Sequence, residues 1–268
     1  MCYNNVNQIF VYFSILAMMI YTSNTVRIKE LRVPDVVRVG TGVVLDCDYT
    51  LEDSADHSGL VVKWYLNDES RPVYQWIPGE KGPQGLGVLR DRLNLEYRAS
   101  EDVRTVHRAL HIPAPALNMS GAYTCVVSTF SDEDRQTKNM LVFVPEKSLR
   151  LKLAKTSEGL QSVVCSAESV YPQPEISVCM AQANVSGELE GRQVLSRERD
   201  GLFDISVIAV LPLEVLNMPA EFTCELRVPR ANYTVRKEFV YYPGNSSVTH
   251  SAVLWIVATI SLYVLLRY

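Results

Sequence analysis

Short apolar and β-branched runs, separated by turn-forming residues, fill the chain between residues 26 and 243. Typical runs are LVVKWYL (60–66), VHRALHI (106–112) and GAYTCVVSTF (121–130). No helical period of useful length occurs in this region of the sequence. Many short strands with regular turn signals are typical of β-sandwiches and barrels. The pattern therefore predicts an all-β protein, and a length of 268 residues suggests about two domains.

The N-terminal end departs from this pattern. Residues 9–20 are apolar except for Ser14, and this run is too short to span a bilayer core of about 30 Å. Ser23 and Thr25 are small residues placed for cleavage, so the pattern predicts that residues 1–25 are a signal peptide. A signal anchor is the alternative. Cleavage would leave a secreted or surface-bound chain.

The C-terminal end carries a second apolar run. Residues 252–266 are apolar or small and uncharged, and only Arg267 and Tyr268 follow them. We expect residues 243–268 to be the signal for a glycosylphosphatidylinositol (GPI) anchor, attached at Gly244 or Asn245. A short transmembrane segment is the alternative. Under either alternative the region between the two ends lies outside the cell.

The cysteine count and the glycosylation motifs fit an extracellular location. The chain has six cysteines, and Cys2 would leave with the signal peptide. The remaining five cannot all pair within one chain, so one is expected to be unpaired or intermolecular in an oxidising compartment. Four Asn-x-Ser/Thr motifs are candidate glycosylation sites: Asn118, Asn184, Asn232 and Asn245.

The first unit resembles an immunoglobulin domain. Trp64 follows Cys47 by 17 residues, and Tyr123 stands two residues before Cys125. The resemblance implies a disulfide between Cys47 and Cys125, covered by Trp64, with Tyr123 in the tyrosine corner. The two cysteines are 78 residues apart, which leaves room for the extra edge strands of a variable-type domain. Met119 stands where the pattern usually has an aspartate, so the usual ion pair of that aspartate is not expected.

The second unit resembles a constant-type immunoglobulin domain. Cys165 and Cys224 are 59 residues apart, which leaves no room for extra strands, and the resemblance implies that they are bridged. Phe222 replaces the corner tyrosine. We expect two tandem immunoglobulin-like β-sandwiches, a variable-type domain over 26–145 and a constant-type domain over 146–242.

The fifth cysteine lies in the stretch VYPQPEISVC (170–179). Alternation places apolar Ile176 and Val178 on one strand face, and Glu175, Ser177 and Cys179 on the other. Val178 then takes the position of the core tryptophan, and Cys179 points outward as the unpaired or intermolecular thiol. The alternative register turns Cys179 inward as a small inert side chain.

A finer resemblance concerns the first-domain segments LRVPDVVRVGTGVVLDCDY, VVKWYLNDE and VYQWIPG. They are similar to insect beaten-path-type proteins, which are neuronal surface or secreted immunoglobulin proteins. The resemblance implies a sidestep-like immunoglobulin receptor, or a second copy of the chain, as the partner. It also implies a role in axon guidance or neuronal adhesion.

Two surfaces of the first domain are candidates for partner binding. One is the acidic loop SDED (131–134) after the run GAYTCVVSTF, whose charges would steer a basic partner surface or, in the alternative, form only a solvated tip. The other is the sheet that carries Trp64, where an outward Tyr74 and Trp76 would form an aromatic patch beside Tyr65. In the alternative register Val73 and Gln75 face outward and Trp76 is core. The candidate residues are Tyr65, Tyr74, Trp76, Val126, Asp132, Glu133 and Asp134.

No catalytic or metal-binding pattern is present in the sequence. His107 and His111 are four residues apart, but they lie in a strand-like run and not on the helix that such a zinc motif needs. The formal net charge of −4 gives no global attraction to nucleic acid. We therefore expect a non-enzymatic recognition protein at the extracellular face of the plasma membrane, without cofactor or metal. The alternative is a soluble secreted binder of small molecules, lipids or microbial surface components.

Overall fold

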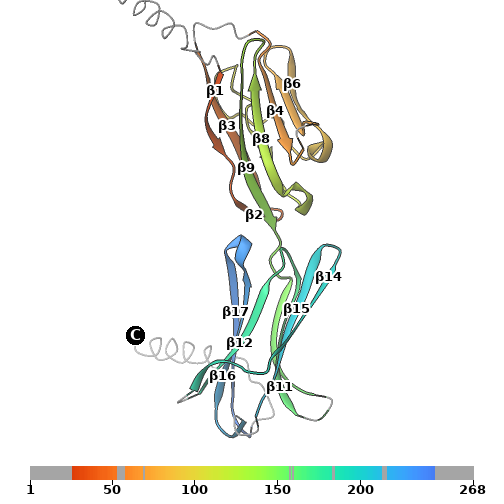
Figure 1. The fold of residues 1–268 in the computed structure, drawn as a ribbon, viewed down its shortest axis with the longest axis vertical. Helices are drawn as coiled ribbons and strands as arrows, with labels where there is room; N and C mark the ends of the chain where they lie inside the picture. Colours follow the sequence, from red (N-terminus) through yellow and green to blue (C-terminus); the bar gives the residue numbers. More distant parts are fainter. Residues whose placement is uncertain are drawn as a thin grey trace, which may run out of the picture. The chain divides into compact units, whose positions relative to one another are not determined.

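The structure is a computed structural model that describes residues 26–244, except for 53–57, 69, 157, 159, 183–184 and 213–215. The described chain forms two compact units that divide between Phe143 and Val144, two residues before the predicted boundary. Both units are built from β-strands, as Figure 1 shows. The predicted signal peptide, the candidate acceptors Asn184 and Asn245, and nearly all of the anchor segment lie outside the described residues.

The first unit pairs a three-stranded sheet with a six-stranded sheet. In the order of pairing, the smaller sheet contains β1 (Val26–Arg32), β3 (Val43–Leu51) and β7 (Leu110–Ile112). The larger contains β2 (Val36–Arg38), β9 (Glu133–Phe143), β8 (Gly121–Ser128), β4 (Val61–Leu66), β5 (Tyr74–Ile77) and β6 (Lys81–Gly85). Strands β5 and β6 are the extra edge strands of a variable-type domain. Two 3-10 turns, η1 (Gly87–Leu89) and η2 (Leu117–Met119), lie between strands.

The core of the first unit follows the expected alternation. Cys47 and Cys125 are joined by a disulfide, with their Cα atoms 6.4 Å apart, and Trp64 is fully buried. The hydroxyl of Tyr123 donates a hydrogen bond to the carbonyl of Met119 at 2.8 Å, which forms the tyrosine corner. Met119 is itself buried, so this position has exchanged a possible ion pair for apolar packing.

The run at 106–112 forms less strand than its pattern suggests, since β7 begins only at Leu110. Two aromatic side chains from the opposite sheet donate hydrogen bonds to backbone carbonyls just before β7. The hydroxyl of Tyr74 donates to the carbonyl of His107 at 2.6 Å, and the indole N–H of Trp64 donates to the carbonyl of Arg108 at 3.1 Å. These carbonyls accept hydrogen bonds from the core, so they are not part of the strand ladder with β3.

The second unit is a sandwich of two four-stranded sheets. One sheet contains, in order, β10 (Ser148–Lys155), β11 (Gln161–Val170), β15 (Leu202–Val210) and β14 (Gln193–Arg199). The other contains β13 (Val185–Glu188), β12 (Glu175–Gln182), β16 (Ala220–Val228) and β17 (Tyr233–Tyr241), with η4 (Pro229–Ala231) between the last two strands. A disulfide joins Cys165 and Cys224 across the core. The predicted fold class, two tandem immunoglobulin-like sandwiches, is confirmed.

Val178 takes the place of the core tryptophan in the second unit. It is fully buried and lies directly opposite Cys224 in the β12–β16 pairing. Phe222 fills the corner position, and its ring stacks on that of Phe239 with the ring centres 5.2 Å apart. Aromatic packing between β16 and β17 therefore supplies apolar volume in a core that lacks the large indole.

Candidate recognition surface

The outer face of the six-stranded sheet presents two rows of side chains. The first row runs across four strands, because Lys63 lies opposite both Gln75 and Val126, and Val126 lies opposite Arg135. In the second row Thr124 lies opposite both Tyr65 and Thr137. All seven positions alternate with core positions on their strands and so face away from the core. We call them the outer face: Lys63, Tyr65, Gln75, Thr124, Val126, Arg135 and Thr137.

The centre of the outer face is closely packed and weakly polar. Val126 and Thr124 are only 5% and 4% exposed, although neither points into the core. The hydroxyls of Thr124 and Thr137 lie 2.8 Å apart and share a hydrogen bond. Arg135 forms an ion pair with Glu133 at 2.7 Å near one edge. A closely packed centre beside a charged edge is compatible with the apolar core and polar rim of a protein interface.

The prediction of an aromatic patch on the outer face of β5 is wrong, and Trp76 is core as in the alternative register. Tyr74 lies opposite Trp64 in the β4–β5 pairing, so it shares the inward face of Trp64. Tyr74 and Trp76 are 2% and 4% exposed, and the ring of Trp76 contacts that of His107 edge-on. Burial raises the pKa of the Tyr74 hydroxyl. Gln75 occupies the outward position, and Tyr65 and Val126 are the predicted face residues that do lie outside.

Two of the three acidic residues after β8 hold β1 in place. Asp132 accepts a hydrogen bond from the amide of Val26 at 2.9 Å, and Asp134 accepts one from the amide of Ile28 at 2.7 Å. Gln136 completes this ladder by donating to the carbonyl of Ile28 at 3.0 Å. These side chains satisfy the edge of β1, which pairs with β3 on its other side. The prediction of three steering charges is therefore corrected, because only Glu133 is exposed.

Phe130 is the surface residue that the sequence pattern concealed. Its side chain is 85% exposed at the turn between β8 and β9. The amide of Phe130 donates to the carbonyl of Ser58 at 3.1 Å, and a Cβ placed on Gly59 would lie 2.5 Å from the ring. The ring thus rests on the backbone of the neighbouring turn, which orients it. The run GAYTCVVSTF suggests a strand through residue 130, whereas β8 ends at Ser128.

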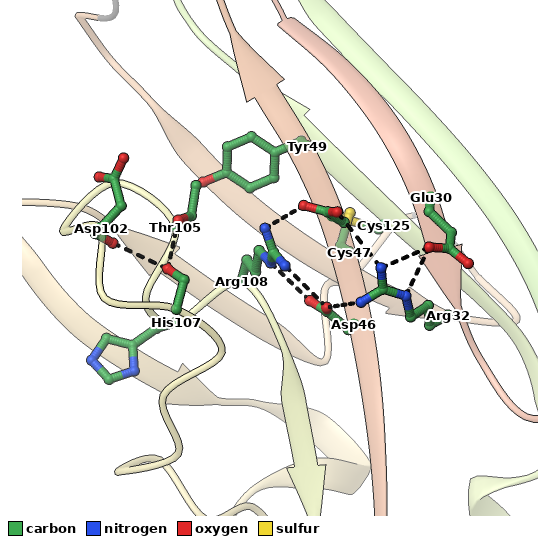
Figure 2. A network of polar contacts seen from close by, with 12 residues as sticks. Glu30, Arg32, Asp46, Cys47, Tyr49, Asp102, Thr105, His107, Arg108 and Cys125 are labelled. Carbon is green, nitrogen blue, oxygen red and sulfur yellow. Dashed lines mark hydrogen bonds and ion pairs between the residues drawn. A yellow bond between two sulfur atoms is a disulfide. The ribbon is translucent and has the colours of Figure 1, made fainter.

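The opposite sheet carries a network of ion pairs, drawn in Figure 2. Arg108 binds Asp46 with Nε–Oδ1 at 2.9 Å and also binds Asp48. Arg32 reaches Asp46 at 3.2 Å and Glu30 at 2.7 Å. Each charged group in this network has an opposite partner, and its two arginines and three carboxylates leave a net charge of −1.

The structure describes some of the residues predicted for glycosylation and for anchor attachment. Asn118 and Asn232 are exposed, as glycosylation requires, and Asn232 has a left-handed backbone conformation with φ of 48°. Gly244 is also exposed, but its role in anchor attachment stays a prediction. Within the described ranges, no group of three or more His, Cys, Asp or Glu side chains could hold a metal ion. The same residues include no helix long and apolar enough to cross a membrane.

Cys179 lies on the outer side of β12 and is half-buried. Its neighbours across the sheet are Glu188 on β13 and Thr223 on β16. Burial raises the pKa of the Cys179 thiol, and the carboxylates of Glu188 and Glu225 raise this pKa further. The structure therefore has the outward register, and an intermolecular disulfide at this position stays a prediction.

We expect the Cys179 thiol to react with iodoacetamide at pH 8 more slowly than free cysteine does. A raised pKa leaves less of the reactive thiolate at a given pH. Glu188→Gln removes one of the carboxylates that disfavour the thiolate and should speed the reaction. Glu198→Gln, a change at an exposed carboxylate on β14, is the matched control. An unaltered rate in the Glu188 variant would contradict this account of the thiol.

Known proteins resemble this chain both in sequence and in structure. No protein-family model matches it. Programmed cell death 1 ligand 1 of Mus musculus is 29% identical over 147 residues, 53% of this chain and 47% of the relative. Selection and upkeep of intraepithelial T-cells protein 1 of Macaca fascicularis is 27% identical over 176 residues, 63% of this chain and 47% of the relative. The chain thus spans about half the length of these curated relatives, and neither name describes an enzyme.

Solved structures show the same two-domain fold. Bovine butyrophilin matches with a TM-score of 0.59 and 16% identity over 78% of this chain and 95% of its own. Rst D1-D2 matches with a TM-score of 0.53 and 17% identity over 80% and 97% of the two chains. None of these matches is to a beaten-path-type protein. Taken together, the strand order, the two bridged cores and these relatives show that both domains are extracellular-type domains of the immunoglobulin superfamily.

Proposed function

We propose that this chain is a non-enzymatic recognition protein of the cell surface that binds another surface protein through its first domain. The observation that carries the proposal is the outer face, with its packed centre, together with the strongly exposed ring of Phe130 in the turn after β8. Exposed aromatic side chains held in a fixed orientation are typical anchors of protein interfaces. Two comparisons support a surface-protein partner, because one relative is named a ligand and one matched structure contains ICOS in complex with ICOS-L.

Phe130→Ala should weaken partner binding about 30-fold, which corresponds to the roughly 2 kcal/mol of an interface hot spot. The full chain would be displayed on cells and titrated with a soluble partner found in a screen of surface immunoglobulin proteins. Val103→Ala is the matched control, because Val103 is 77% exposed in the segment between η1 and β7. Surface display of the variant shows that it folds.

A second variant tests the outer face itself. Lys63→Glu combined with Arg135→Glu reverses the charge of the first row without touching the core. We expect this pair of changes to weaken binding by about tenfold, since reversed rim charges oppose a complementary partner surface. Full binding by both this variant and Phe130→Ala would refute the proposed surface.

Membrane attachment through residues 243–268 is part of the proposal. It is supported by the uncharged run at 252–266 and by the small residues Gly244 and Asn245. Release of the displayed chain by a phosphatidylinositol-specific phospholipase would identify the GPI form. Resistance to the enzyme would identify a transmembrane segment. Material found only in the medium would favour the soluble secreted binder.

The beaten-path-type identity is a finer proposal within the same class of function. Its support is the amino-acid sequence of the first-domain segments quoted above. This identity implies a sidestep-like partner and a role in axon guidance. The relatives named above instead concern programmed cell death 1 and intraepithelial T cells. Including sidestep-like receptors in the binding screen, together with the chain itself, separates these identities.

A further inference from the structure

Exposed apolar side chains are concentrated at one end of the second domain. In the described part of the chain, ten large apolar side chains are exposed. Three of them lie in the first domain, and two are adjacent on β14. The other five lie where β15 and β17 end and in the turns beside them: Leu160, Val210, Met218, Val240 and Tyr242. We call these five residues the apolar collar.

Backbone contacts place the apolar collar at a single pole, at the lower end of this domain in Figure 1. The turn before β11 holds Leu160, and the amide of Leu211 donates to the carbonyl of Gln161 at 2.9 Å, which brings the end of β15 beside that turn. Ala220 at the start of β16 lies opposite Tyr241 at the end of β17. Met218 and Tyr242 each lie within two residues of that pair.

The apolar collar carries little charge around it. Among the described residues of these turns and strand ends, the charged side chains are Lys155, Glu158 and Glu221, all of them exposed. Together with Glu214, which is in the connection between β15 and β16 but outside the described residues, these side chains carry a net charge of −2. Such a small charge gives no strong attraction to a basic or an acidic surface. An exposed apolar group with little net charge fits an uncharged, partly apolar surface.

The chain leaves the second domain at this pole. Tyr242 is followed by nine residues, 243–251, before the apolar run at 252–266 begins. If the run is retained as a transmembrane segment, these nine residues span at most about 30 Å when fully extended. If a GPI anchor is attached at Gly244 or Asn245 instead, the run is removed and the lipid follows Tyr242 within three residues. Under either form of attachment, the apolar collar is at the end of the domain from which the chain reaches the lipid.

We propose that the apolar collar is a membrane-contact surface that rests in the interfacial region of a zwitterionic lipid bilayer. This inference rests on the membrane attachment given under the proposed function. Tyrosine is enriched at membrane interfaces, where its ring lies among the headgroups and its hydroxyl stays hydrated. Leu160 and Met218, which project from turns on either side, insert shallowly at the same level. Contact with the lipid sets the orientation of the second domain relative to the membrane.

Depth-dependent fluorescence quenching tests this proposal on the full chain. In a Cys179→Ser background, Met218→Cys is labelled with an environment-sensitive fluorophore, and the protein, purified from cell membranes with its attachment intact, is reconstituted into phosphatidylcholine vesicles. The matched control is Val194→Cys on β14, because Val194 is 49% exposed and Met218 is 54% exposed. A doxyl-labelled phosphatidylcholine should quench the fluorophore at position 218 at least about twofold more than that at 194, as expected for interfacial insertion.

A second labelled position and a mutation complete the test. Leu160→Cys should show the same strong quenching as position 218, and Tyr242→Ser should reduce the quenching at both. Equal quenching at positions 160, 218 and 194 in membrane-bound protein would overturn the proposal while leaving the anchor intact. Failure of the chain to remain with the vesicles would instead overturn the membrane attachment on which the proposal rests. Unchanged partner binding by the labelled variants would confirm that the first domain is folded.

Discussion

Replacing Cys47 and Cys125 together with alanine is expected to lower the free energy of unfolding of the first domain by about 4 kcal/mol. The disulfide closes a loop of 78 residues, and removing it restores conformational entropy to the unfolded chain. Both cysteines are fully buried, so no new hydrogen-bonding group is left unpaired by the change. Urea unfolding followed by tryptophan fluorescence reports on this domain, since Trp64 and Trp76 both lie in it.

The matched control is the equivalent double replacement of Cys165 and Cys224. The disulfide between these two cysteines closes a loop of 59 residues in the second domain. That variant should lose a similar amount of stability, but its loss should be seen by circular dichroism and not by tryptophan fluorescence. The described part of the second domain contains no tryptophan. A tryptophan transition that stays at the same urea concentration in the Cys47/Cys125 variant would contradict the expected role of the bridge.

Trp64→Ala is expected to destabilise the first domain by about 3–5 kcal/mol, the usual cost of truncating a buried aromatic ring. Trp64 is fully buried against the disulfide between its neighbours Cys47 and Cys125. Its indole N–H also donates to the carbonyl of Arg108 at 3.1 Å, and that contact holds the turn before β7. Loss of the ring therefore removes both apolar packing and a hydrogen bond from the six-stranded sheet to the segment before β7.

Trp64→Phe separates these two contributions. It keeps most of the apolar ring but leaves the carbonyl of Arg108 without its donor, so we expect a smaller loss of about 1–2 kcal/mol. Because both variants lack the Trp64 signal, unfolding would be followed by circular dichroism in urea. A loss below about 1.5 kcal/mol for Trp64→Ala would show that the core refills the space and that the indole is not its centre.

The direction of a side chain on the six-stranded sheet is predictable where the residue is next to a core residue in the sequence, and it is not predictable beyond a turn. Tyr65 and Val126 flank Trp64 or Cys125 directly in the sequence, so alternation alone places them on the outer face. Tyr74 and Trp76 lie beyond a turn, and their face depends on how β5 pairs with β4. A shift of one residue in that pairing reverses the direction of every side chain on the strand.

The comparison with known proteins supports the class of the family prediction and leaves its finer part a proposal. Short first-domain segments suggest beaten-path-type proteins, whereas the two curated relatives described above are other immunoglobulin-type proteins. Residues that build an immunoglobulin core recur across the superfamily, so they specify the fold. In the function proposed above, partner choice depends on exposed positions such as Phe130 and the outer face, and the sequence of the core carries little information about such positions.

By itself, the sequence determined the all-β class, because strand alternation is a local property of the chain. The resemblance to immunoglobulin domains implied the two bridged cores, and alternation favoured the outward face of Cys179 over the inward alternative. Only the tertiary structure decided that Asp132 and Asp134 bind the edge of β1, across 106 residues of sequence. It also decided that Phe130 is exposed and that five apolar side chains share one pole. Such groupings are set by which strands pair and where turns meet in space, and no sequence period encodes them.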